Sequence, residues 1–183
     1  FGANFLETFL SPVAYHRGFA GMRGGRPGRR GYLVQFETRL SQTAAAADEW
    51  IPLHPGTEGL AALAIGRLVA EKQGGALPGA FLEVDVAAAA QASGIPPEEL
   101  ERLASIFAGA EHALAIPGAS ALGHSNGLEA AQAILAVNAL VGNLGKPGGV
   151  FLTPEAGTPG QAASLRDVHE LVSRMREGKI KTL

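Results

Sequence analysis

The chain alternates short apolar runs with longer amphipathic segments, a pattern typical of strands followed by helices. Apolar runs predict strands over residues 32–37 and 112–116, and a brief extended piece over residues 50–53. Helical spacing of apolar residues, with glycine and proline at the ends, predicts helices over residues 12–22, 44–48, 58–73, 82–92, 97–108, 128–141 and 161–176. Residues 179–183 are expected to start a further strand.

At the amino end, Phe1 runs into Gly2-Ala3-Asn4, which indicates the exit of a strand whose body would precede Phe1. Strands that alternate with helices favour parallel pairing through right-handed crossovers. The expected fold class is therefore α/β, with an open, mostly parallel, Rossmann-like sheet covered by helices on both faces. We expect residues 1–160 to form this domain and residues 161–183 to form a helix and strand that lead toward the next domain.

Composition excludes several classes of protein. Apolar residues make up 46% of the 183 residues and charged residues 17%, which is globular rather than disordered. A net charge of -2 gives no field that would attract nucleic acid, so no nucleic-acid partner is expected. The absence of cysteine excludes disulfides, thiolate zinc sites and cysteine-ligated iron–sulfur clusters within these residues. The most apolar helical stretch, residues 128–141, is too short to cross a bilayer.

Three predicted strand ends carry short polar or glycine-bearing loops, which begin at Gly2, Glu37 and Gly118. In a doubly wound sheet such loops converge on one crevice. A glycine lets backbone amides approach a phosphate, and an acidic residue at the next strand end can accept hydrogen bonds from ribose hydroxyls. The spacing is not a Gly-x-Gly-x-x-Gly fingerprint, so the residues alone leave two readings open, a nucleotide crevice or ordinary turns with a solvated strand end.

Other candidate chemistry is weaker. A cluster of arginines in a glycine-rich loop lacks interleaved aromatic residues and is best explained as a solvated loop; it comprises Arg23, Arg26, Arg29 and Arg30. The five histidines show no zinc-ligand spacing. Ser120 and His124 lack the Gly-x-Ser-x-Gly elbow of a hydrolase. We expect Trp50 to fill core space beside Ile51, with one hydrogen-bond partner for its N–H.

One longer constellation is more specific. From residue 37 the chain reads Glu-Thr-Arg-x-Ser-x-Thr-Ala-x-x-x-Asp-x-Trp-Ile-Pro-Leu-His-Pro-Gly-Thr-Glu, ending at Glu58. This resembles the molybdopterin oxidoreductase (dimethyl sulfoxide reductase) family, whose members carry Asp-Pro-Arg, Thr-x-Thr-Ala, Ala-Asp and Pro-Gly-Thr-Asp in this order. Gly2-Ala3-Asn4 is similar to the family's Gly-x-Asn-Pro turn. Residues 142–149 are similar to its Gly-Asn-x-Gly-Lys-Pro-Gly-Gly segment.

The resemblance implies that the chain is one domain of a larger oxidoreductase subunit, of the type that holds the guanosine half of a molybdopterin guanine dinucleotide. Iron–sulfur clusters and the metal ligand would lie in other domains. Carried over by position, Gly2 and Asn4 would contact the phosphates, Glu37 the ribose, and Arg39 the nearby loop or base. The guanine edge would meet Thr57 and Glu58. The full candidate set for cofactor binding is Gly2, Asn4, Glu37, Arg39, Gly56, Thr57, Glu58 and Gly118.

The sequence departs from that pattern inside the expected pocket. Phe5 stands where the turn has proline, Glu37 and Thr38 replace Asp-Pro, His54 replaces arginine, and Glu58 replaces aspartate. Each longer carboxylate moves its oxygens by more than a bond length, which disturbs a bidentate contact. The alternative is therefore a cofactor-free structural domain.

A second resemblance bears on that alternative. Residues 2–12 are also similar to the large iron–sulfur subunit of the alternative complex III quinol oxidoreductases, whose molybdopterin-like half is understood to lack molybdenum. This resemblance implies a respiratory, quinol-oxidising complex. The partners would be the remaining domains of the subunit and other redox subunits, on the bacterial periplasmic or membrane-associated side.

Overall fold

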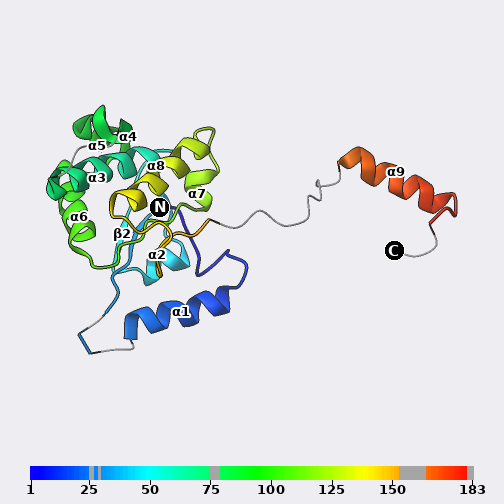
Figure 1. Ribbon diagram of the computed structural model, residues 1–183, viewed down its shortest axis with the longest axis horizontal. Helices are drawn as coiled ribbons and strands as arrows, with labels where there is room; N and C mark the ends of the chain where they lie inside the picture. Colours follow the sequence, from blue (N-terminus) through cyan, green and yellow to red (C-terminus); the bar gives the residue numbers. More distant parts are fainter. Residues whose placement is uncertain (25–26, 29, 75–78, 153–163, 181–183) are drawn as a thin grey trace. The chain divides into compact units, whose positions relative to one another are not determined.

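The computed structural model describes residues 1–24, 27–28, 30–74, 79–152 and 164–180. They fall into two units, Phe1–Phe151 and Leu152–Leu183, each described by itself. The elements are labelled in Figure 1. In chain order they are α1 (Pro12–Gly24), β1 (Val34–Phe36), α2 (Gln42–Ala46), β2 (Glu49–Ile51), α3 (Glu58–Gln73), α4 (Gly79–Leu82), α5 (Val86–Ser93), α6 (Pro97–Gly109), α7 (Ala119–Leu122), α8 (Gly127–Leu140) and α9 (Leu165–Arg176).

The sheet of the first unit is small. β1 and β2 pair in parallel, with Val34 opposite Glu49 and Phe36 opposite Ile51. The α/β class with parallel pairing is confirmed, and the unit is mostly helical. An open Rossmann-like sheet is not formed by the residues that the structure describes.

The prediction of a strand over residues 112–116 was wrong. On one edge of this segment, two asparagine side chains bond the backbone where a neighbouring strand would pair. Asn138 receives a hydrogen bond from the Ala115 N–H at 2.9 Å and donates one to the Ala115 carbonyl at 2.7 Å. Asn143 donates to the Ala113 carbonyl. The segment is therefore extended but carries no strand pairing on that edge.

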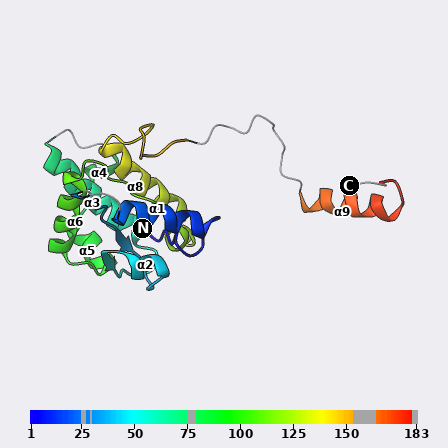
Figure 2. The ribbon, with the colours of Figure 1, turned by 90° about the horizontal axis from the view of Figure 1, so that it is seen from below.

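Helix α3 is the centre of the first unit. It packs against α8, α6, α5 and α4, and it lies against α8 and α6 in both views (Figure 1, Figure 2). One core cluster joins its apolar face to β1, β2, α5 and α6, and a second joins it to α7 and α8. The crossing with α8 is close, because a Cβ on Gly59 would lie 2.8 Å from the Cα of Ala130.

Most helices form where the apolar spacing predicts them, and α3 has the predicted bounds. It ends at Gly74, whose φ of 68° is the left-handed conformation that glycine adopts without strain. The single helix predicted over residues 82–92 was wrong. The chain forms α4 and α5 instead, because the Asp85 side chain accepts a hydrogen bond from the Ala88 N–H and starts a new helix there.

The second unit contains α9, which begins at Leu165 and is preceded by a capping box that pairs Ser164 and Asp167. The helix predicted over residues 161–176 is confirmed from Leu165 onward, and its first residues lie outside the described part of the chain. The strand predicted over residues 179–183 is not seen at Lys179 or Ile180, and residues 181–183 lie outside the described ranges.

Candidate functional site

The three loops singled out in the sequence converge in the first unit. The Gly2 N–H donates to the Phe36 carbonyl at 2.7 Å, which places the first loop beside the end of β1. The Gly118 N–H donates to the Phe1 carbonyl at 3.0 Å, which places the third loop on its other side. The expected crevice is therefore assembled from distant parts of the chain.

The two loop glycines allow close packing of the loops against each other. Gly2 has a φ of 64°, and a Cβ there would collide with the Ser120 hydroxyl and lie 2.7 Å from the Ala121 nitrogen. A Cβ on Gly118 would collide with Ala3. Neither position therefore has room for a side chain.

Glu37 is enclosed by its own neighbours. Its carboxylate is 1% exposed, and it accepts hydrogen bonds from the Ser41 hydroxyl at 2.5 Å and the Gln35 amide at 3.3 Å. The Trp50 indole N–H donates to the Glu37 carbonyl at 2.9 Å. Trp50 is 37% exposed, so the single partner for its N–H is confirmed but its expected place in the core was wrong.

Glu58 is the second buried carboxylate. It is 0% exposed, and its Oε1 accepts a hydrogen bond from the Ser120 hydroxyl at 3.2 Å. Its Oε2 is buried without a hydrogen-bond partner among the described residues. Asn4 is also buried, and its side-chain oxygen already has a partner within the same loop. The Oδ1 of Asn4 accepts a hydrogen bond from the Thr8 hydroxyl at 2.7 Å.

The other candidate residues are more accessible. The Arg39 side chain is 56% exposed, and its guanidinium lies 3.4 Å from a Glu7 oxygen and 4.0 Å from a Glu37 oxygen. The Gly56 carbonyl accepts from the Asn126 amide at 2.8 Å. Thr57 precedes α3, but its hydroxyl donates to the His54 carbonyl at 2.6 Å and does not cap the helix.

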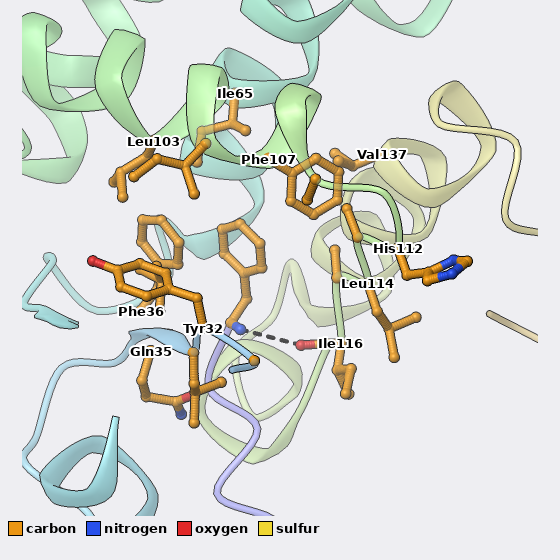
Figure 3. A pocket seen from close by; sticks show the side chains of 18 of the residues that line it. Tyr32, Gln35, Phe36, Ile65, Leu103, Phe107, His112, Leu114, Ile116 and Val137 are labelled. Carbon is orange, nitrogen blue, oxygen red and sulfur yellow. Dashed lines mark hydrogen bonds between the residues drawn. The ribbon is translucent and has the colours of Figure 1, made fainter. Parts of the chain in front are cut away.

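The first loop is also held against residues 112–116. The backbone nitrogen of Phe1 donates to the Ile116 carbonyl at 3.1 Å, the dashed bond in Figure 3.

In this arrangement the residues do not fit a bound guanosine. The carboxylate expected on the ribose and the one expected on the guanine edge are both covered, because Glu37 is 1% and Glu58 is 0% exposed. The structure thus brings together Gly2, Glu37, Glu58 and Gly118, while their role toward a cofactor remains a prediction. Among the described residues there is no group of three or more carboxylate and histidine side chains that could hold a metal ion.

The arginine loop is not simply solvated. Arg23 forms an ion pair with Asp48, and Arg30 lies 2.7 Å from the other oxygen of the same carboxylate. Arg26 and Arg29 lie outside the described residues. Although burial opposes it, hydrogen bonds from the Leu33 N–H and the two arginines lower the pKa of Asp48.

Sequence reasoning missed the two asparagines that hold residues 113–115. A signal for Asn138 was present, because a polar residue on the apolar stripe of a helix is buried only when it is hydrogen-bonded.

No helix in the described ranges is both long and apolar enough to span a membrane.

No family model matches the chain. Over 98% of its length the chain is 28% identical to the menaquinone reductase, molybdopterin-binding-like subunit of Nitratidesulfovibrio vulgaris, and it spans 28% of that relative's length. This similarity supports the resemblance to the molybdopterin oxidoreductase family and leaves the alternative complex III resemblance untested.

A solved structure shows a related fold. Acetylene hydratase from Pelobacter acetylenicus matches with a TM-score of 0.53 and 24% identity, over 61% of this chain and 17% of that chain. At this level of identity the match concerns the fold alone.

Proposed function

We propose that this chain is a domain of a molybdopterin-family oxidoreductase subunit, and that it serves as a structural domain whose former nucleotide crevice is closed by its own side chains. The similarity to a molybdopterin-binding-like subunit supports the first part. The observation that carries the second part is the burial of Glu37 and Glu58, which are 1% and 0% exposed. A carboxylate that a ligand must reach cannot be covered on all sides.

The partners follow from the same proposal. The relative is named as a subunit of a menaquinone reductase, so we propose that this domain packs against other domains of its subunit and, through them, against further redox subunits. A periplasmic or membrane-associated location of the kind expected from the sequence agrees with that name. The quinol-oxidising complex of the second resemblance is kept as the more specific proposal.

A second candidate function is supported by one atom. Oε2 of Glu58 is buried and has no partner within the described residues, and a carboxylate can accept hydrogen bonds from the N1 and N2 donors of guanine. If α7 moved away with Ser120, this oxygen would be available to a guanine edge. The second candidate is therefore a domain that binds the guanosine half of the dinucleotide after a local opening.

Binding and stability measurements together separate the two candidates. The chain and its Glu58→Met variant are titrated calorimetrically with guanosine monophosphate and with molybdopterin guanine dinucleotide. Their free energies of unfolding are then measured in denaturant. The closed structural domain gives no binding heat for either ligand, and Glu58→Met raises stability by about 1–2 kcal/mol, because an apolar side chain of similar size replaces a buried and incompletely bonded charge.

A matched control is Glu49→Met. Glu49 is paired with Arg102 and Tyr32, so its loss should lower stability where Glu58→Met raises it. Saturable binding that disappears in Glu58→Met but persists in Glu49→Met would support the second candidate and refute the closed one.

A further inference from the structure

Helix α1 stands apart from the packed core of the first unit. It has no buried residue, and no other described helix or strand makes an extensive contact with it. In Figure 1 it lies at the lower margin of the unit, away from α3 and α8. A Cβ added to Gly18 or Gly21 would meet no atom within 4 Å. One side of α1 is therefore open among the described residues.

The other side of α1 is held by aromatic rings and by an ion pair. Phe5, in the loop before the helix, packs against Tyr15 and Phe19, with ring centroids 6.3 Å and 6.2 Å apart. Arg23, in the last turn, forms an ion pair with Asp48. These contacts fix which side of the helix faces the domain. Side chains on the opposite side therefore point away from it.

Two aliphatic side chains protrude where α1 begins. Leu10, in the loop before the helix, is 103% exposed, and Val13, in the first turn, is 75% exposed. A single exposed aliphatic residue is ordinary on a protein surface. Here two of them lie three residues apart, at the start of a helix that no other described element covers. The chain thus presents apolar side chains at a place where nothing in its own fold buries them.

The same part of the chain is strongly basic. Residues 8–36 contain five of the fifteen basic residues and none of the seventeen acidic ones, which gives this segment a formal charge of +5 in a chain of net charge -2. Asp48 offsets part of this charge, because Arg23 and Arg30 share its carboxylate. Arg17 is exposed and lies one turn after Val13 on the same side of α1. The protruding aliphatic residues are therefore accompanied by positive charge.

We propose that α1 and the loop before it form the surface by which this domain binds an anionic lipid membrane. Leu10 and Val13 enter the boundary between the headgroups and the acyl chains, and Arg17 binds lipid phosphate. Helices that lie on membranes combine exposed apolar residues with arginine or lysine in this way. An anionic leaflet attracts basic residues close to its surface. The inference goes beyond the proposed function and does not depend on whether the crevice is open or closed.

A protein partner is the alternative, and the shape of this surface favours the membrane. A stable protein interface covers about 800 Å² on each partner and packs apolar side chains into fitted pockets. Beside Val13 and Arg17, the open side of α1 consists of Ala14, Gly18 and Gly21, which offer little to such a pocket. A fluid headgroup layer needs no complementary shape, because it adapts to protruding side chains.

Helix α9 is the other place where a membrane could bind. It has an apolar stripe that includes exposed Val172, but acidic residues are interleaved with its basic ones, as at Asp167, Glu170 and Glu177. Their charges oppose attraction to an anionic surface. Residues 8–36 contain no acidic residue, so the charge pattern favours α1 over α9.

The test places an environment-sensitive dye at one position at a time. The chain contains no cysteine, so Val13→Cys gives a single labelled site on α1. Leu128→Cys is the matched control, because Leu128 on α8 is 70% exposed, and Val172→Cys reports on α9. Each labelled chain is mixed with vesicles of phosphatidylcholine alone and with vesicles of equal parts phosphatidylcholine and phosphatidylglycerol.

The dye at Val13 should shift to shorter wavelength with the anionic vesicles only, because it enters an apolar layer there. The dyes at Leu128 and Val172 should not shift. The shift should disappear at about 1 M salt, where the Debye length falls to about 3 Å. A shift at Val172 without one at Val13 would overturn the proposal, and so would an equal shift with neutral and anionic vesicles.

Cosedimentation with the same vesicles supplies an independent measurement without a dye. Arg17→Glu and Leu10→Asp should each weaken binding to anionic vesicles by about tenfold, because the first reverses a charge at the membrane surface and the second removes an inserted apolar group. Leu128→Asp should leave binding unchanged. If the unsubstituted chain does not sediment with anionic vesicles, the proposal is wrong and the surface belongs to a protein interface. The melting temperature of each variant shows whether it is folded.

Discussion

The ring of Phe1 stacks on the ring of Phe36, with centroids 4.4 Å apart and planes inclined by 4°. The two residues are far apart in the sequence, and their contact fixes the amino end of the chain against the end of β1. Gly2, next to Phe1, is thereby placed beside the loop that contains Glu37. The candidate site is thus positioned by an aromatic pair of the core.

Replacing Phe36 with alanine should destabilise the first unit by about 3 kcal/mol or more, because Phe36 is buried and its removal leaves a cavity under Phe1. Chemical denaturation measures the loss. Phe151→Ala is the control, because Phe151 is 62% exposed and its change should be within about 0.5 kcal/mol. Similar effects from both substitutions would contradict the role of the stack.

Asn138→Ala should destabilise the first unit by about 2–4 kcal/mol, because it leaves the N–H and carbonyl of Ala115 without their partner in a buried place. Gln132→Ala on the exposed side of the same helix is the control. Hydrogen exchange of the Ala115 amide should become faster in Asn138→Ala and remain unchanged in Gln132→Ala. A small and equal loss of stability in both variants would refute the role of Asn138 in holding the backbone of Ala115.

Asp48→Asn should lower stability at neutral pH by about 1–3 kcal/mol, because two arginines and the Leu33 N–H lose their charged acceptor. The pKa of Asp48 is lowered in the folded chain, so its contribution is present above the ordinary aspartate pKa and is lost as the pH falls through the folded value. The difference between the chain and the variant, measured by acid denaturation, should vanish at low pH. Exposed Glu98→Gln serves as the control.

Much of the fold could be predicted from local signals. The bounds of α3 follow from an apolar stripe that ends at two glycines, and parallel pairing follows from the alternation of strands and helices. The break between α4 and α5 was missed because the apolar spacing over residues 82–92 is that of a single helix. Asp85 starts a new helix inside this stretch by capping it. The strand over residues 112–116 was overestimated because its edge is satisfied by side chains from residues 138 and 143.

The position of the candidate site could be predicted, but its state could not. Spacing along the chain is enough to bring Gly2, Glu37 and Gly118 together once the strands are parallel. Whether the crevice is open depends on contacts between distant side chains, above all the Ser120 hydroxyl beside Gly2 and Glu58. Such contacts follow from tertiary packing, and a single sequence contains no periodic pattern that predicts them.

The close crossing of α3 and α8 sets a limit on evolutionary change. Since a Cβ on Gly59 would meet the backbone of Ala130, a larger residue at either position forces the two helices apart. Moving α8 also moves Asn138, which holds the edge of residues 113–115. Among related sequences, positions 59 and 130 should therefore vary jointly in side-chain volume, and enlargement at one should be accompanied by changes along the whole α8 face.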